Sequence, residues 1–407
     1  MKYLKTFICL FIAFNLSGQT FTNYTTADGL VDNNVSCGTY EGNGVMWFGT
    51  QNGISNFDGT NWTNITTTTD TALVSNTITA IKKMANGDLW VGTDFGVCKY
   101  SNSTWQCFTS SDGLGDNRIK YIEESSDGRI WIGEYDGLSI YDGLNWTSYN
   151  MSDGLPFGGI QHIKFDNNSD AWMGTDGPFG GLIHFDGTNF TIYNKNDGLL
   201  NNRVNGIAID SQNNKWVGNS EGLSVFNNQN IFQNNYTQMY LLPPPDTLNP
   251  VMDLAFDSRN LLWVGIYIDY LLNGGIAMYN GFSWVDFNMS DGLIGPVITD
   301  LIIDDQDQVW VTTSSGISKI TNVPANVNNL KENDVTIYPN PSNGTFMIKN
   351  STKSGYNISI KNIGGEILSS FNNKSNTSQI NLPYASGIYI LEINDGSQTF
   401  FKKIVRN

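Results

Sequence analysis

The stretch IWIGEYDGLSIYDGLNW, residues 130–146, decides the fold because closely similar stretches recur along the chain. Residues 46–62 read MWFGTQNGISNFDGTNW, and residues 89–105 read LWVGTDFGVCKYSNSTW. The tryptophan at the second position recurs every 41 to 47 residues, as Trp47, Trp90, Trp131, Trp172, Trp216, Trp263 and Trp310. A repeat of this length indicates an array of equivalent structural units.

Each repeat predicts four short strands. Asp-Gly and Asn-rich pairs separate runs of alternating apolar and polar residues, as in hairpin turns. Twelve residues before each repeat tryptophan stands a β-branched residue, which indicates a buried strand position. These residues are Val35, Ile78, Ile119, Ile160, Val204, Val251 and Ile298. Four antiparallel strands in about forty residues describe a propeller blade. We therefore predict an all-β protein in which residues 19–325 form a seven-bladed β-propeller.

The two ends of the array predict how the ring closes. The seventh repeat stops at GISKITNV, residues 316–323, without the final strand that the other repeats have. Residues 21–30, FTNYTTADGL, resemble that missing strand followed by the usual turn. We expect residues 21–25 to complete the last blade, because such pairing removes open sheet edges.

The first eighteen residues predict a signal peptide. Lys2 and Lys5 precede an apolar run over residues 7–16, and Ser17-Gly18 suits cleavage. The run is too short to span a bilayer, which takes about 20 residues, and no later stretch predicts a membrane span. The formal net charge of −16 argues against nucleic acid as a partner.

The repeat pattern resembles the two-component regulator propeller repeat family. The matching pattern is DGL…N/R-x-V/I…DG-x-x-W-x-G-T…G-L-S-x-Y/F-D-G. In that family such arrays form extracellular sensors of hybrid histidine kinases. Since no transmembrane, kinase or DNA-binding segment is recognised after the repeats, we do not expect the signalling role to apply here.

Residues 326–335 are a polar linker, and residues 336–407 predict alternating strands of a small Ig-like β-sandwich. This last segment resembles the type A C-terminal sorting domain of the type IX secretion system of Bacteroidetes. The matching motifs are Tyr338-Pro339-Asn340-Pro341, Gly344, Gly364-Gly365, Leu382, Gly387-Ile388-Tyr389 and Lys402-Lys403-Ile404-Val405-Arg406. The resemblance implies that the secretion machinery recognises residues 336–407, exports the protein through the outer membrane and removes the domain near the linker.

One set of repeat positions is predicted to face the propeller axis. His162 lies ten residues before Trp172, in the expected innermost strand. Its equivalents in the other repeats are Cys37, Ala80, Tyr121, Gly206, Asp253 and Asp300. The simplest interpretation is that these are solvated channel residues. Asp253 and Asp300 alone are weak support for calcium, the two histidines do not form a zinc site, and no motif implies a nucleotide cofactor.

A catalytic alternative uses the same positions. Tyr121 or His162 could abstract the proton next to a uronate carboxylate while Arg118 and Arg203 neutralise that carboxylate. This would make the protein a polysaccharide lyase.

Three connections are longer than their counterparts and are expected on one face of the propeller. They are residues 174–181, residues 265–275 and residues 240–250. They contain an unusual number of apolar and aromatic residues for loops: Phe179, Tyr240, Tyr267, Tyr270, Leu271 and Leu272. Exposed clusters of this kind mark binding sites, and aromatic rings suit sugars and protein partners equally. The alternative is that these side chains pack on one another.

Two cysteines test the predicted pairing of the third and fourth strands in the second repeat. If Tyr100 pairs with Trp105, Cys98 and Cys107 stand directly opposite on neighbouring strands. Export to an oxidising space would allow a disulfide, although such cross-strand positions often strain it. Cys37 is left single.

These observations favour a secreted or cell-surface protein whose propeller is a non-catalytic binding module for a glycan or a protein. The lyase is the alternative from another class. A detached sensor that works through a membrane partner is a third interpretation.

Overall fold

The computed structural model describes two units, residues 1–325 and residues 326–407. In the first unit the described residues are 19–237, 239–240, 248–281 and 284–322. In the second they are 335–338, 342–350, 356–361, 367–373, 377–385, 387–394 and 399–406. The predicted signal peptide, residues 1–18, lies outside them.

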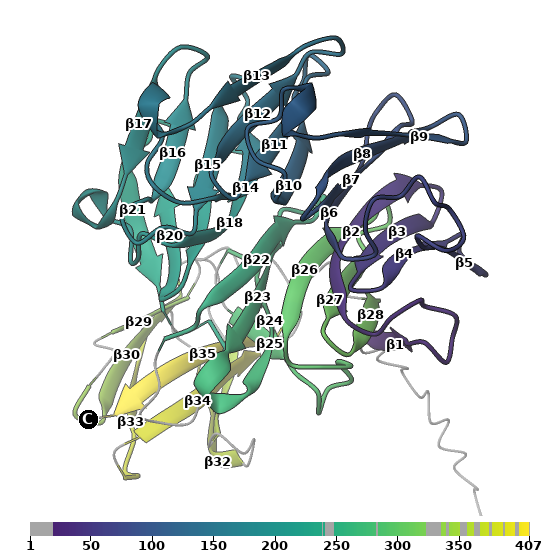
Figure 1. Ribbon diagram of the computed structural model, residues 1–407. Helices are drawn as coiled ribbons and strands as arrows, with labels where there is room; N and C mark the ends of the chain where they lie inside the picture. Colours follow the sequence, from purple (N-terminus) through teal and green to yellow (C-terminus); the bar gives the residue numbers. More distant parts are fainter. Residues whose placement is uncertain are drawn as a thin grey trace, which may run out of the picture. The chain divides into compact units, whose positions relative to one another are not determined.

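The described residues of the first unit form seven four-stranded antiparallel sheets, which we call blades 1 to 7 (Figure 1). The strands of a blade are called a to d, from the innermost outward. Blades 1 to 3 are β2(Val35–Gly42)–β3(Val45–Thr50)–β4(Gly53–Phe57)–β5(Trp62–Ile65), β6(Ile78–Lys83)–β7(Leu89–Thr93)–β8(Gly96–Ser101)–β9(Thr104–Phe108) and β10(Ile119–Glu124)–β11(Ile130–Glu134)–β12(Gly137–Tyr141)–β13(Trp146–Tyr149).

The remaining blades have the same order. Blades 4 to 6 are β14(Ile160–Phe165)–β15(Ala171–Thr175)–β16(Leu182–Phe185)–β17(Phe190–Tyr193), β18(Val204–Ile209)–β19(Lys215–Asn219)–β20(Gly222–Phe226)–β21(Phe232–Tyr236) and β22(Val251–Phe256)–β23(Leu262–Ile268)–β24(Asn273–Tyr279)–β25(Trp284–Phe287). Blade 7 is β26(Ile298–Ile303)–β27(Val309–Thr313)–β28(Gly316–Thr321)–β1(Thr20–Tyr24). Short 3-10 helices are η1(Ser110–Asp112), η2(Met151–Asp153), η3(Lys195–Asp197) and η4(Asp269–Leu271).

The innermost strands follow one another around a common axis. Each contacts the next in the order β2, β6, β10, β14, β18, β22, β26 and back to β2. The ring is closed between blades 7 and 1 by β1, which pairs with β28 from Thr20 opposite Thr321 to Tyr24 opposite Ile317. The ring of Tyr24 stacks on Trp310 and contacts Phe57 of blade 1, with centroids 5.8 and 5.3 Å apart. The first strand of the chain therefore joins the last blade to the first.

An acidic side chain six residues before the repeat tryptophan holds the turn between strands a and b. In blade 7, Asp304 Oδ2 accepts the indole N–H of Trp310 at 3.0 Å, and Oδ1 accepts the backbone N–H groups of Gln306 and Gln308 at 3.0 and 2.9 Å. The same pairing joins Trp47 to Glu41, Trp172 to Asp166, Trp216 to Asp210 and Trp263 to Asp257. One side chain thus ties the backbone of the turn to the core of the blade.

The second unit is also built of antiparallel strands. One sheet has the order β29(Val335–Tyr338)–β30(Thr345–Asn350)–β33(Thr377–Asn381), and the other β32(Ile367–Asn373)–β31(Tyr356–Lys361)–β34(Gly387–Asn394)–β35(Thr399–Arg406). Apolar side chains from both sheets share one core, which includes Phe346, Ile358, Ile380 and Leu391. The predicted all-β class is confirmed for both units.

Candidate functional site

The connections between strands b and c and those between one blade and the next lie on one face, which we call the loop face. Strands alternate in direction within a blade, so both sets of connections leave at the same end. Hydrogen bonds join the two sets: Tyr135 N–H donates to Arg118 O at 3.0 Å and Gly96 N–H donates to Asn117 O at 2.8 Å.

Most of the exposed large apolar side chains described in residues 19–322 stand on the loop face. They are Val74, Phe95, Tyr135, Met151, Phe157, Phe179, Leu248, Leu271, Leu272 and Met289. The others are Leu144 and Ile231, at turns between strands c and d, and Ile192 on an outer strand. The apolar surface of the propeller is therefore concentrated on one side.

The exposed aromatic rings of this face belong to blades 2 to 4. We call Phe95, Tyr135, Phe157 and Phe179 the aromatic arc; their exposed fractions are 64%, 52%, 59% and 81%. The Arg118 guanidinium lies 3.8 Å from the centre of the Tyr135 ring. Arg118 also pairs with Asp116 at 2.5 Å, and Lys120 pairs with Asp176 at 2.7 Å. The Tyr135 ring therefore stands beside charges that are already compensated.

Of the residues predicted to form a binding surface on the long connections, the structure exposes some and buries others. Phe179 and Leu272 are strongly exposed, Leu271 is 37% exposed and Tyr267 is half-buried. Tyr240 is a correction: it is buried, and its hydroxyl donates to Gly274 O at 3.1 Å. It packs in the core of blades 5 and 6 because an apolar ring with one satisfied hydroxyl gains more from burial than from exposure.

Two parts of that prediction lie outside what the structure describes, namely the side chain of Tyr270 and residues 241–247. Sequence reasoning missed Phe95, Tyr135 and Phe157, because their connections have ordinary length. For Phe95 and Tyr135, the signal that could have found them is an aromatic residue in the turn between strands b and c, where blades 1 and 7 have only polar residues between the flanking positions, Gln51-Asn52 and Ser314-Ser315. Phe157 lies in the connection between β13 and β14.

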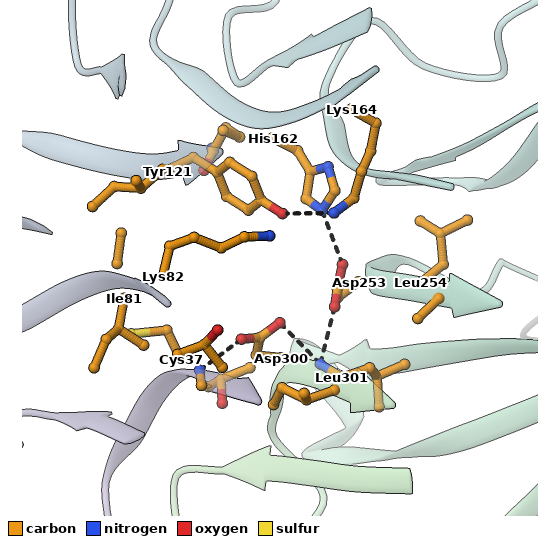
Figure 2. A pocket seen from close by; sticks show the side chains of 18 of the residues that line it. Cys37, Ile81, Lys82, Tyr121, His162, Lys164, Asp253, Leu254, Asp300 and Leu301 are labelled. Carbon is orange, nitrogen blue, oxygen red and sulfur yellow. Dashed lines mark hydrogen bonds and ion pairs between the residues drawn. The ribbon is translucent and has the colours of Figure 1, made fainter. Parts of the chain in front are cut away.

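A cavity of about 860 Å³ follows the axis of the ring (Figure 2). The positions predicted to face the axis line it, with the exception of Gly206: they are Cys37, Ala80, Tyr121, His162, Asp253 and Asp300. A β-bulge in the first residues of every innermost strand gives these positions the same place in each blade.

One wall of the cavity carries two lysines around one buried carboxylate. Glu123 accepts Lys82 at 2.5 Å and Lys164 at 2.9 Å, and Lys164 also donates to the Tyr121 hydroxyl at 3.3 Å. Burial would raise the pKa of Glu123, but the two lysines outweigh it and lower that pKa to about 2. We call Lys82, Glu123 and Lys164 the cationic wall, since it has one positive charge in excess.

The opposite wall holds two carboxyl groups, and we call Asp253 and Asp300 the acidic wall. Asp253 accepts the backbone N–H of Leu301 at 2.9 Å, and Asp300 accepts that of Gly38 at 2.8 Å, each from the next blade. Burial, reinforced by the charge of Asp253, raises the pKa of Asp300 to about 8. Burial raises the pKa of Asp253 as well.

His162 stands between the two walls. Its ring centre lies 4.3 Å from that of Tyr121, and its Nε2 lies 3.4 Å from Asp253 Oδ1. Burial lowers the pKa of His162 to about 3, so the imidazole is neutral. Its Nδ1 is buried and has no hydrogen-bond partner.

The four residues of the lyase hypothesis do not meet in this cavity. Tyr121 and His162 share it, whereas Arg118 and Arg203 do not line it. Arg118 is held by Asp116 on the loop face, and Arg203 is exposed at the start of β18. Burial also raises the pKa of Tyr121, so its phenol stays protonated and is not available to accept a proton.

Two further findings concern the cysteines and the second histidine. The structure joins Cys98 and Cys107 by a disulfide between directly opposite positions of β8 and β9, while Cys37 is free and buried. His184 stacks on Trp172 and lies 2.8 Å from Asp170, away from the cavity.

Among the described residues, no group of three or more His, Cys, Asp or Glu side chains is placed to hold a metal ion. Nor does any helix there have the length and apolar character needed to cross a membrane.

Comparison with known proteins gives one family match within each unit. Residues 113–136 match the family described as two component regulator propeller, and residues 336–407 match the secretion system C-terminal sorting domain. No curated protein matches the chain.

Three solved structures are similar to it. The extracellular domain of BT3049, ascribed to a hybrid two component system of B. thetaiotaomicron, has a TM-score of 0.64 at 19% identity over 95% of this chain and 57% of its own. PorZ, a surface component of the type-IX secretion system of Porphyromonas gingivalis, has a TM-score of 0.58 at 18% identity over 93% of this chain and 60% of its own. A streptogramin B lyase has a TM-score of 0.58 at 13% identity over 74% of this chain and 97% of its own. At these identities the similarity shows the fold alone, and the chain spans less than two thirds of the first two proteins.

Fold and sequence matches together define a propeller protein that carries a secretion tail. More specifically, its propeller matches the two component regulator propeller family over residues 113–136, and its tail matches the secretion system C-terminal sorting domain over residues 336–407. That domain indicates export to the cell surface or beyond it.

Proposed function

We propose that this exported propeller is a non-catalytic binding module, and that its loop face binds a glycan. The observation that carries the proposal is the concentration of exposed apolar side chains on that face, with all four rings of the aromatic arc in neighbouring blades. Soluble proteins rarely leave such clusters without a partner.

The chemistry around the aromatic arc favours a sugar over a protein. Aromatic faces stack on the apolar faces of sugar rings, while paired ions supply donors and acceptors for hydroxyl groups. Asp116 with Arg118 and Asp176 with Lys120 provide such pairs beside Tyr135. Because these charges are already balanced, a neutral glycan suits the arc better than a strongly charged one.

A glycan array with the purified full chain tests the proposal. We expect retention of a neutral glycan, and we expect Tyr135→Ala and Phe179→Ala each to weaken it by about 1–2 kcal/mol, or roughly 5- to 30-fold. The matched control is Leu144→Ala, an equally exposed apolar side chain at a turn between strands c and d. A chain that retains no glycan, or arc variants that bind as the parent does, would show that the proposal is wrong.

A further inference from the structure

The central cavity, which is separate from the proposed glycan site on the loop face, has positive side chains on one wall and carboxyl groups on the other. Figure 2 shows the lysines of the cationic wall on one side and the carboxyl groups of the acidic wall on the other, pointing into the same space. Two lysines share Glu123, so the first wall keeps a positive charge. The second wall offers carboxylate oxygens without any cationic side chain in direct contact with Asp300.

One buried acceptor between these walls is unused. His162 Nδ1 has no hydrogen-bond partner and its side chain is 6% exposed, while Asp253 Oδ1 faces His162 Nε2 at 3.4 Å. A proton on the His162 Nε2 that faces Asp253 leaves Nδ1 as an acceptor. Buried polar atoms without partners are unfavourable, so this part of the cavity is suited to a ligand that donates hydrogen bonds. An ammonium group is such a donor, and its charge complements the acidic wall.

The far end of the cavity is apolar. Every innermost strand begins at the loop face, so its last residue lies at the opposite end. The last residues that line the cavity are Tyr40, Lys83, Phe165, Ile209, Phe256 and Ile303. All but Lys83 are apolar or aromatic, and Lys83 pairs with Glu41 at 2.9 Å. These side chains offer apolar contacts beside Lys82 and Lys164, which stand one residue before Lys83 and Phe165 in the same strands.

We propose that the central cavity binds a zwitterionic small molecule with an apolar side chain, of the amino acid or short peptide class. Its carboxylate contacts Lys82 and Lys164, and its ammonium contacts Asp253 and His162 Nδ1. The volume of about 860 Å³ lies within the range of small-molecule sites, roughly 300–1,000 Å³. This site is independent of the glycan proposed for the loop face.

Calorimetric titration of the purified full chain tests the inference with a matched set of probes. The zwitterions are L-phenylalanine, L-leucine and the dipeptide L-leucyl-L-phenylalanine. The half molecules 3-phenylpropionate and 2-phenylethylamine each keep the apolar group and only one charge. We expect at least one zwitterion to bind and each half molecule to bind roughly 10- to 100-fold more weakly, since each loses charge-assisted hydrogen bonds.

Two variants locate the binding. Lys82→Met keeps Lys164 on Glu123, and Asp253→Asn keeps an oxygen for the Leu301 N–H, so both preserve the wall they alter. Each should weaken zwitterion binding about tenfold or more, while Lys349→Met on the second unit leaves it unchanged.

Three results would overturn the inference: no zwitterion binds, the half molecules bind as well as the zwitterions, or folded variants keep the affinity of the parent. The melting temperature of each variant establishes that it is folded. If a variant does not fold, the comparison of zwitterions with half molecules on the parent chain still tests whether the cavity binds a zwitterion.

Discussion

The link between Asp304 and Trp310 makes a quantitative prediction about stability. Replacing Asp304 with alanine removes the acceptor of the Trp310 indole and of the Gln306 and Gln308 backbone N–H groups. Trp310 is 1% exposed, so its indole N–H cannot turn to water. A buried donor left unpaired costs about 1–3 kcal/mol.

The two turn hydrogen bonds add a smaller amount. Each backbone bond contributes about 0.5–1.5 kcal/mol, and the exposed Gln306 N–H recovers part of this from water. We therefore expect Asp304→Ala to destabilise the propeller by about 2–4 kcal/mol, measured by urea unfolding through the propeller transition. Gln306→Ala changes an exposed side chain in the same turn and should stay within about 0.5 kcal/mol.

Blade 3 supplies the converse experiment. Ser125 stands where five of the other blades have the acidic residue, and the buried indole N–H of Trp131 has no partner. We expect Ser125→Asp to stabilise the protein by about 1 kcal/mol, since it provides the missing acceptor. If Asp304→Ala costs no more than the Gln306→Ala control, or if Ser125→Asp gives no gain, the indole hydrogen bond does not stabilise these blades as we reason.

Three further outcomes are expected. Deleting residues 19–25 should lower the melting temperature and cause association, because it exposes the edge of β28 and removes Tyr24 from the seam; an unchanged melt would contradict the closure of the ring by β1. Burial raises the pKa of Glu134 to about 7, above its unfolded value of about 4.3, so its contribution to stability is present at low pH and is lost as the pH rises through 7. Glu134→Gln should therefore gain up to about 3 kcal/mol over the parent at pH 8 and little at pH 4; equal gains at both would contradict the shift. Alkylation of the denatured, unreduced residues 19–407 should label Cys37 alone, and reduction should add Cys98 and Cys107; mass spectrometry distinguishes one label from three.

Much of the architecture could be predicted because its signals are local. The alternation of apolar and polar residues and the recurring tryptophan indicate strands and turns within one repeat. The pairing of Tyr100 with Trp105 likewise follows from a four-residue turn, and it places Cys98 opposite Cys107. Because the repeat occurs in every blade, the same local pattern is found several times along the chain, which strengthens the prediction.

The site was less accessible to sequence reasoning. The burial of Tyr240 depends on how its connection folds onto blades 5 and 6. Glu123 lies forty-one residues from both Lys82 and Lys164, and only neighbouring blades bring the three together. The place of Arg118 outside the cavity follows from its pairing with Asp116 and from the direction of its strand, neither of which a repeat alignment contains.

The amino-acid sequence by itself determined the blade pattern, the secretion tail and the positions that face the axis. These depend on hydrophobic alternation and motif spacing, which operate over a few residues and repeat along the chain. Only the tertiary structure decided which charges face one another across the cavity and which rings remain on the surface. The physical reason is that such contacts join residues of different blades, so they exist only once the ring has closed and burial has selected the side chains that leave water.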